Sequence, residues 1–176
     1  MIDGSHVAQG PRVAIRRLDR ADFAEVHALR EESAEMLARW LGARENTREA
    51  FDGSLDLLEQ PTREGLVICL ASTGQIVGGV NINNIVRGTL QSGVLGYTAY
   101  ASTTGQGYMT EGLGLVVRFA FGELGLHRLE ANIQPGNRAS LKLIERVGFR
   151  REGFSPAFQY INGAWRDHER WALTAP

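Results

Sequence analysis

The stretch Tyr97-Thr98-Ala99-Tyr100-Ala101-Ser102-Thr103-Thr104-Gly105-Gln106-Gly107-Tyr108-Met109-Thr110-Glu111 joins an alternating segment to a glycine turn and then to a helical pattern. Gly105 and Gly107 allow backbone N–H groups to converge, and the start of a helix adds a partial positive charge that attracts phosphate. The apolar residues behind the turn have the spacing of one buried helical face: Met109, Leu113, Val116, Val117, Ala120 and Leu124. The stretch therefore predicts a phosphate cradle at the start of a helix that docks on the core.

The rest of the chain alternates between strand and helix patterns. Strands are predicted over residues 12–18, 66–71, 76–84, 89–99, 126–133, 149–161 and 164–173. Helices are predicted over residues 23–41 in two pieces, 47–60, 108–124 and 137–147. This order indicates an α+β fold with a mixed, mostly antiparallel central sheet and helices on both of its faces. We expect a single domain over residues 12–176, with residues 1–11 as a disordered or tag-like tail.

Local signals mark several ends of these elements. Asp19 is placed to cap a helix with Asp22 as its reciprocal acid, and Thr47 and Asn137 are placed to cap two later helices. Asn162-Gly163, between the last two strand patterns, is the strongest signal for a two-residue hairpin turn.

Composition excludes several classes of function. The 176 residues are 43% hydrophobic and 22% charged, which is ordinary for a globular core, and the net charge of −1 provides no basic field for nucleic acid. Cys69, the single cysteine, lies in an apolar run and indicates a buried thiol. No apolar run approaches the roughly 18 residues of a membrane span, the N-terminus lacks a signal-peptide core, and no metal-ligand spacing occurs. We therefore expect a cytoplasmic location, no membrane and no metal.

Three motifs resemble those of the GNAT acetyltransferases. Thr104-Gly105-Gln106-Gly107-Tyr108-Met109 is similar to the family's pyrophosphate loop, Gln/Arg-x-x-Gly-x-Gly/Ala, although Thr104 stands where Gln or Arg is usual and Met109 where a small residue is usual. Pro135-Gly136-Asn137-Arg138-Ala139-Ser140, continuing to Gly148-Phe149, resembles the family's Asn-x-x-Ala/Ser helix. The segment 160–168 looks like the RimJ/RimL branch, which acetylates protein N-termini. The resemblance covers roughly residues 12 to 174.

The resemblance implies acetyl-CoA as the cofactor and assigns residues to it. The cofactor-binding residues expected from it are Thr104, Gly105, Gln106, Gly107, Tyr108, Met109, Thr110, Asn137 and Ser140. It places Asn137 by the pantetheine or thioester end and Ser140 by the sulfur, although a helix cap and a small first-turn residue are the structural alternatives for the two. It further implies that Thr98 or Ala99 donates a backbone N–H to the acetyl carbonyl. Ile144 occupies the position of the tyrosine that often serves the family as acid.

No side chain is identified as the general base. Glu111 is favoured by the helix dipole whatever its function, Glu130 lies on a strand between the two main motifs, and Gln159 stands where some RimL-like relatives have Glu. An α-amine with a pKa near 8 is already partly neutral at pH 7 and needs less base than a lysine. We therefore expect deprotonation through water.

The acceptor side is expected to include four side chains: Trp40, Asn83, Asn84 and Tyr160. Trp40 has core or lid packing as its alternative, and the asparagines have turn formation.

The expected function is acetyl-CoA-dependent N-acetylation by direct transfer to an α-amine, the N-terminus of a protein or peptide, with a ribosomal protein as one candidate acceptor. The alternatives are acetylation of a small amine such as an antibiotic or polyamine, and a catalytically silent CoA-binding sensor. The chain is expected as a monomer or homodimer.

Overall fold

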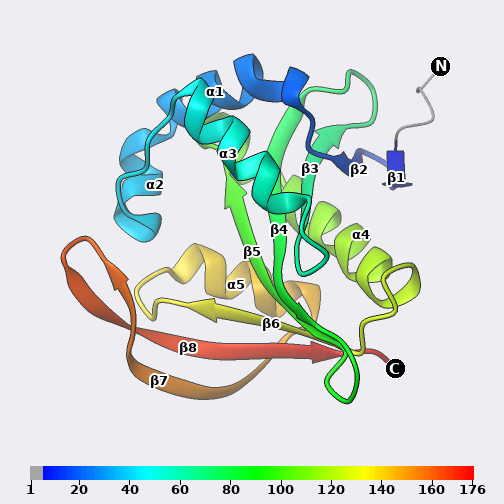
Figure 1. Ribbon diagram of the computed structural model, residues 1–176, viewed down its shortest axis with the longest axis vertical. Coiled ribbons are helices and arrows are strands. Elements are labelled where there is room, and N and C mark those ends of the chain that lie inside the picture. Colours follow the sequence, from blue (N-terminus) through cyan, green and yellow to red (C-terminus); the bar gives the residue numbers. More distant parts are fainter. Residues whose placement is uncertain (1–5) are drawn as a thin grey trace.

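The computed structural model describes residues 6–176, which form one eight-stranded sheet with helices on both faces (Figure 1). The strands are β1 (His6–Gln9), β2 (Val13–Arg17), β3 (Glu64–Leu70), β4 (Ile76–Val86), β5 (Ser92–Ala99), β6 (Arg128–Ile133), β7 (Arg150–Ile161) and β8 (Ala164–Thr174). The helices are η1 (Arg20–Asp22), α1 (Phe23–Glu32), α2 (Ala34–Leu41), α3 (Arg48–Leu58), η2 (Ala101–Thr103), α4 (Tyr108–Gly122) and α5 (Arg138–Val147). The predicted fold class is confirmed.

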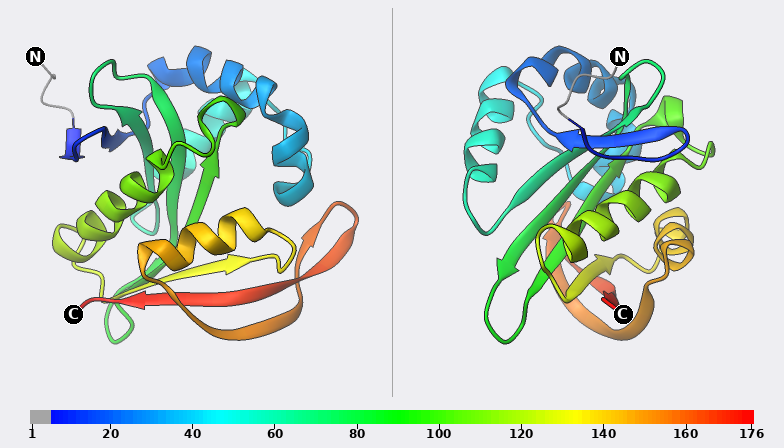
Figure 2. Two further views of the ribbon diagram at one scale, coloured as in Figure 1. Left: turned by 180° about the vertical axis from the view of Figure 1, so that it is seen from behind. Right: turned by 90° about the vertical axis from the view of Figure 1, so that its right-hand side faces the viewer.

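The sheet has the order β1-β2-β3-β4-β5-β6-β8-β7 and separates two hydrophobic clusters. On one face, α4 and α5 cover the larger cluster, and Figure 2 shows these two helices together from behind. On the other face, Val26 of α1 and Phe51 and Leu55 of α3 pack against Val67 and Ile76 of the sheet. Both faces are therefore closed by amphipathic helices, as the helical spacing predicts.

Strands β5 and β6 form the one parallel pair among the described strands, and they part after a short contact. Their pairing runs only from Ser92 with Arg128 to Val94 with Glu130. Beyond it, β5 stays paired with β4 as far as Ala99, and β6 stays paired with β8 as far as Ile133. The two strands diverge visibly in Figure 1. The backbone edge of β5 that faces β6 is thus unpaired near Thr98 and Ala99, where the sequence resemblance implies an N–H donor.

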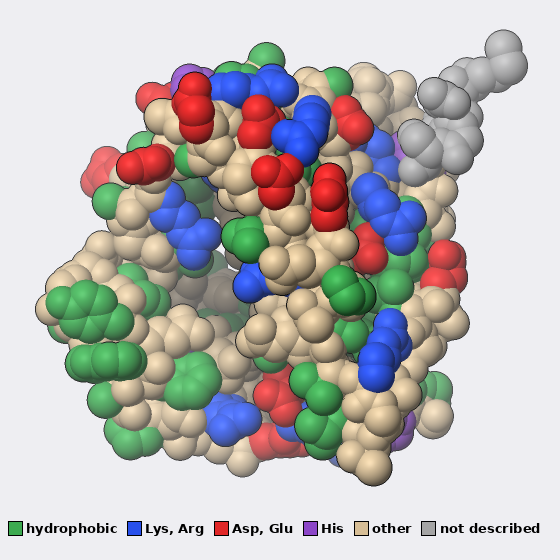
Figure 3. Space-filling view, viewed as in Figure 1, with side chains coloured by type: hydrophobic (Ala, Val, Ile, Leu, Met, Phe, Trp, Pro, Cys, Tyr) green, Lys and Arg blue, Asp and Glu red, His purple; other side chains and the backbone are tan. Residues whose placement is uncertain are grey.

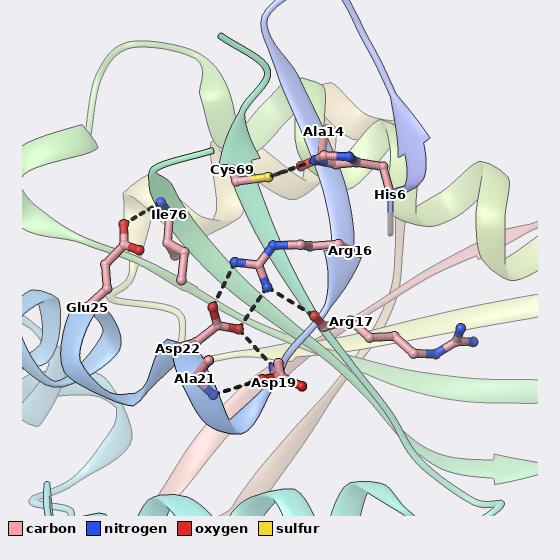
Figure 4. A network of polar contacts seen from close by, with 10 residues as sticks. All are labelled: His6, Ala14, Arg16, Arg17, Asp19, Ala21, Asp22, Glu25, Cys69 and Ile76. Atoms are coloured by element: carbon pink, nitrogen blue, oxygen red, sulfur yellow. Dashed lines mark hydrogen bonds and ion pairs between the residues drawn. The ribbon is translucent and has the colours of Figure 1, made fainter. Parts of the chain in front are cut away.

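The predicted cap at the start of the helical region is present and is tied to the sheet (Figure 4). Asp19 accepts a hydrogen bond from Ala21 N at 2.8 Å, and Asp22 accepts one from Asp19 N at 2.8 Å. Arg16 of β2 donates two hydrogen bonds of 2.8 Å to the Asp22 carboxylate. The end of β2 and the first helical turn are therefore held together by a bidentate ion pair.

The N-terminal segment differs from its prediction. His6–Gln9 forms β1, which pairs antiparallel with β2, and Val7 and Ala8 pack against the main core. This strand has too few residues to show periodicity, and its backbone pairing to β2 decides its conformation. The prediction for residues 1–5 lies outside the described residues.

The hairpin between β7 and β8 turns at the predicted dipeptide. Asn162 and Gly163 have φ of 52° and 74°, the left-handed values that a type I′ turn requires. In the described part of the chain, no helix is long and apolar enough to cross a bilayer.

Candidate active site

A cavity of about 510 Å³ opens where β5 and β6 diverge. Its wall comes from α2 and the segment after it, from β4, β5 and β6, from the start of α5, and from the β7–β8 hairpin. The residues that line it are Trp40, Leu41, Arg44, Asn83, Val94, Leu95, Gly96, Tyr97, Ala131, Asn132, Ile133, Gln134, Asn137, Ser140, Gln159, Tyr160, Ile161 and His168. The space-filling view shows a hollow in this region, with hydrophobic side chains gathered on the hairpin beside it (Figure 3). Among residues 6–176, none of those lining this wall is an aspartate or a glutamate.

Two side-chain amides hold α2 over this cavity. Gln134, just after β6, donates from Nε2 to Trp40 O at 3.0 Å, and Asn162 at the hairpin turn donates from Nδ2 to Ala38 O at 2.8 Å. The Trp40 ring also lies against Gly136, where an added Cβ would be 3.4 Å from the ring. These contacts join α2, the segment after β6 and the β7–β8 hairpin into a frame around the cavity.

Tyr97 meets Ser140 in this cavity. The two hydroxyl oxygens are 2.6 Å apart, and they join β5 to the first turn of α5. Burial raises the pKa of Tyr97 to about 12, against the opposing hydrogen bond with Ser140. The phenol therefore keeps its proton at neutral pH, and the pair can pass a proton to a leaving group beside Ser140 Oγ.

Asn137 has the capping role that its position predicts and also lies in the cavity wall. Its Oδ1 accepts a hydrogen bond from Ser140 N at 3.2 Å. Ile144, one turn further along α5, is fully buried in the core. The acid position of the family therefore carries no polar group here, whereas Tyr97 delivers a hydroxyl from the strand instead.

The glycine loop has the conformation that its sequence requires. Gly105 and Gly107 have φ of 76° and 80°, and Gly107 is the N-cap of α4 without a capping side chain. A Cβ at Gly105 would meet nothing within 4 Å, so the space outside the loop is open. The hydroxyl of Thr104 donates to Ala101 O and the amide of Gln106 to Ser102 O, so both side chains shape the loop itself.

The start of α4 presents backbone N–H groups. The helix's first hydrogen bond runs from Glu111 N to Gly107 O at 3.2 Å, and the N–H groups of Tyr108, Met109 and Thr110 precede it. The Met109 side chain is buried and packs on Gly78, so its contribution to the loop is its backbone. A pyrophosphate fits this arrangement of left-handed glycines and free N–H groups at a helix N-terminus.

Arg12 and Glu111 brace the loop from behind. Glu111 accepts hydrogen bonds from Arg12 N, Arg12 Nε and Val13 N at 2.8, 2.8 and 3.2 Å, and Arg12 Nη1 donates to Gln106 O at 3.0 Å. Desolvation opposes ionisation of Glu111, but these hydrogen bonds outweigh it and hold the pKa of its carboxyl below the ordinary value. Glu111 is therefore a structural carboxylate outside the cavity wall.

The predicted acceptor residues separate into two groups. Trp40, Asn83 and Tyr160 all line the cavity, and Asn83 Oδ1 accepts a hydrogen bond from Arg63 at 3.1 Å. Asn84 is exposed, has φ of 51° at an irregularity of β4, and is absent from the cavity wall. Its geometry fits the turn-forming alternative.

The candidate bases also differ in whether they line the cavity. Glu130 forms ion pairs with Arg128 at 2.9 Å and Arg170 at 3.4 Å and, like Glu111, lies outside the wall. Gln159 lines the cavity, but an amide does not accept the proton of an ammonium group.

Three functional candidates were missed by the sequence patterns: Tyr97, Arg12 and His168. Tyr97 has the sequence context of an ordinary aromatic residue in a strand, which indicates no functional role. Arg12 contacts a carboxylate 99 residues away, and a local sequence pattern does not show such a contact. His168 belongs to the segment that resembles the RimJ/RimL branch, which was the one available signal for it.

Comparison with known proteins assigns the class of this fold and site. Residues 12–150 match the family described as "Acetyltransferase (GNAT) domain", so the chain belongs to the GNAT acetyltransferases, enzymes that transfer an acetyl group from acetyl-CoA. YjcK of Bacillus subtilis, a probable N-acetyltransferase, is 33% identical over 175 residues, which are 96% of this chain and 97% of that protein. The ribosomal protein uS5-alanine N-acetyltransferase of Escherichia coli is 38% identical over 102 residues, 58% of this chain and 53% of that protein.

Solved structures place the fold in the same family. RimJ of Mycobacterium smegmatis, in complex with CoA-disulfide, is 30% identical with a TM-score of 0.87, over 94% of this chain and 86% of that one. The fold alone is shared with a spermidine N-acetyltransferase of Vibrio cholerae in complex with CoA and spermine, at 18% identity and a TM-score of 0.79 over 94% and 96% of the two chains.

Proposed function

We propose that this acetyltransferase acts by direct transfer on the α-amine of a protein or peptide N-terminus, with ribosomal proteins among the candidate acceptors. The observation that carries the proposal is the composition of the cavity wall, which combines amides and aromatic rings with one arginine and no carboxylate. A polyamine carries several positive charges and is best held by carboxylates, whereas an extended peptide terminus carries one charge and many amide groups. The exposed Tyr160 and Trp165 on the hairpin offer apolar surface next to the opening.

Each step of the transfer has a candidate group. Bound acetyl-CoA supplies the acetyl group as a thioester. The backbone edge at Thr98 or Ala99 donates an N–H to the carbonyl oxygen as it gains negative charge. Asn137 and Ser140 contact the thioester end, and the Tyr97–Ser140 pair gives a proton to the departing thiolate. The pyrophosphate lies on the backbone of residues 105–110, with Thr104 and Gln106 shaping that loop.

The comparisons support this proposal because the uS5-alanine enzyme, at 38% identity over its matched part, acts on a ribosomal protein. One observation favours a polyamine as second candidate. Glu32 and Glu35 line a neighbouring hollow together with Trp40 and Asn162, and a cation in that hollow would meet carboxylates that the main cavity lacks.

The test is acetylation of a panel of peptides with free N-termini, read by mass spectrometry. The panel includes alanine, serine and methionine as first residue, each with an N-terminally blocked twin that contains an internal lysine. Spermidine is assayed in parallel by CoA release. We expect modification of the free termini alone. Efficient acetylation of spermidine with unmodified peptides would contradict the N-terminal assignment, and no CoA release with any amine would favour a CoA-binding sensor.

A further inference from the structure

The cavity holds one imidazole that the proposed transfer steps leave unused. His168 lies in the middle of β8, is 3% exposed and lines the same cavity as Tyr97 and Ser140. Within the cavity wall formed by the described residues, the ionisable side chains are Arg44, Tyr97, Tyr160 and His168. An arginine or a tyrosine that keeps its proton cannot accept another one near neutral pH. His168 is thus the side chain of this wall that can take a proton there.

The hydrogen bond of His168 fixes which ring nitrogen is free. Nδ1 lies 3.0 Å from Arg166 O, and a carbonyl oxygen only accepts, so Nδ1 carries the proton in the neutral ring. Nε2 then has a lone pair. Phe158 packs edge-on against the ring, with the two ring centroids 5.6 Å apart. The fully buried side-chain atoms that lack a hydrogen-bond partner do not include Nε2 of His168. This leaves Nε2 as the ring nitrogen available to a molecule in the cavity.

The surroundings keep this imidazole neutral. Burial lowers the pKa of His168 below the ordinary 6.5, against the opposing effects of the Arg166 carbonyl and the Asp167 carboxylate. Asp167 is itself engaged, because its Oδ1 accepts a hydrogen bond from Ala157 N at 2.8 Å. At pH 7 the ring is therefore in the form that accepts a proton.

The position of His168 separates it from the acid pair. The β6–β8 register pairs Asn132 with Arg170, so alternation places His168 on the same sheet face as Asn132. Asn132 also lines the cavity, and its Oδ1 is buried without a partner among the described residues. Tyr97 and Ser140, in contrast, meet on the side covered by α5. A proton acceptor and a proton donor thus enter the cavity from different elements.

We propose that His168 is the general base for the acceptor amine. This inference rests on the proposed function. Nε2 takes one proton from the acceptor ammonium, and the freed amine lone pair forms the C–N bond at the acetyl carbonyl carbon. The C–S bond breaks, and the thiolate takes a proton from Tyr97 through Ser140. Of the nitrogen's surplus proton and the proton on the imidazolium, one returns to Tyr97 through water and the other leaves to the solvent. The requirement for a base near pH 7 is thereby met without a carboxylate.

The test compares pH profiles of kcat/KM for the wild type and His168→Asn with a peptide acceptor. The asparagine amide retains a donor for Arg166 O but has no basic nitrogen. We expect the wild type to reach its plateau by pH 7, because its acid limb follows an imidazole with a pKa below 6.5. In His168→Asn the limb should move to the amine pKa near 8, with a loss of about 10- to 30-fold at pH 7 and recovery to within about threefold at pH 9.

Two controls separate a chemical role from a structural one. His127→Asn removes an exposed histidine outside the cavity and should leave the pH profile unchanged. Acetyl-CoA affinity of His168→Asn, measured by calorimetry, should stay within about threefold of the wild type. A pH-independent loss in His168→Asn, or no loss at pH 7, would overturn the role of His168 as base.

A second measurement requires neither the His168→Asn variant nor catalytic turnover. Imidazole NMR of the wild type should show the Nδ1–H tautomer, a pKa below 6.5, and a shift of the Nε2 signal when acceptor peptide is added without acetyl-CoA. A ring protonated on Nε2 would overturn the proposal even if His168→Asn does not fold. If the wild type acetylates spermidine but no peptide, the N-terminal assignment fails, and the same two pH profiles with spermidine still decide the role of His168.

Discussion

Tyr97 Oη lies 2.6 Å from Ser140 Oγ, so the diverging strand β5 and the first turn of α5 meet through two hydroxyl groups. Ser140 alone is a weak acid, and its side chain has no charge partner in the described structure. Tyr97 supplies a buried phenol whose pKa is raised to about 12. A donor for the thiolate is thereby present although Ile144 fills the position where the family often has tyrosine.

The first prediction concerns this pair. Ser140→Ala and Tyr97→Phe should each lower kcat by about 100-fold, because each interrupts delivery of a proton to the thiolate, with acetyl-CoA affinity changed by less than about threefold. The double variant should lose no more than either single variant, since the two hydroxyls act as one unit. In the wild type, kcat should show no decline from Tyr97 ionisation up to pH 10. Full turnover in Ser140→Ala would return Ser140 to a structural role, and additive losses would contradict a shared path.

The second prediction concerns the glycine loop. Gly107→Val should abolish acetyl-CoA binding in calorimetry, because φ of 80° is strained for a β-branched residue and its Cβ would lie 3.3 Å from Arg12 Nη2. Gly122→Ala is the matched control at the far end of the same helix, since its φ is not left-handed and an added Cβ meets nothing within 4 Å. It should bind acetyl-CoA as the wild type does. Unchanged affinity in Gly107→Val would remove the loop as the pyrophosphate site.

The features that were predicted correctly from the sequence are those that depend on residues close together along the chain. The capping box of Asp19 and Asp22, the glycine turn before α4 and the Asn162-Gly163 turn each depend on a few neighbouring residues, and all three are present. The cap at Asn137 was predicted correctly for the same reason. Local rules therefore fix the ends of the elements, and these ends position most of the site.

The features that sequence missed depend on register between distant strands. Tyr97 and Ser140 are 43 residues apart, and only the pairing of β5 and the docking of α5 bring their hydroxyls together. His168 lies on the cavity side of the sheet through the pairing of β8 with β6, a strand more than 30 residues earlier in the chain. No pattern of residue types encodes either contact. Asn84 shows why residue type alone is ambiguous: asparagine suits both a binding site and a left-handed turn, and the φ of 51° at Asn84 fits the turn.

The third prediction concerns the carboxylate behind the loop. Glu111→Gln should lower the free energy of unfolding at pH 7 by about 2 kcal/mol, because it weakens three hydrogen bonds to one charged group that is 19% exposed. Since the folded-state pKa lies below the ordinary 4.5, this contribution is present above pH 4.5 and is lost as pH falls through the folded value. Urea titrations at pH 7 and pH 3 measure the difference, which should shrink at pH 3. Glu123→Gln, an exposed carboxylate after the same helix, is the control and should change stability by less than about 0.5 kcal/mol. An equal effect of Glu111→Gln at both pH values would contradict the ionised brace.

The last prediction concerns the frame around the acceptor cavity. Asn162→Gly keeps the turn, because glycine adopts φ near 52° readily, but it removes the hydrogen bond of 2.8 Å to Ala38 O. Of the two amide hydrogen bonds described for α2, the one from Gln134 then remains, so KM for a peptide acceptor should rise about fivefold, while KM for acetyl-CoA and kcat change by less than twofold. Asn84→Gly is the matched control, since Asn84 is also left-handed at φ of 51° but lies outside the cavity wall. It should leave all three constants unchanged. A rise in acceptor KM in Asn84→Gly would restore Asn84 as an acceptor-site residue, and an unchanged acceptor KM in Asn162→Gly would mean that α2 does not shape the peptide site.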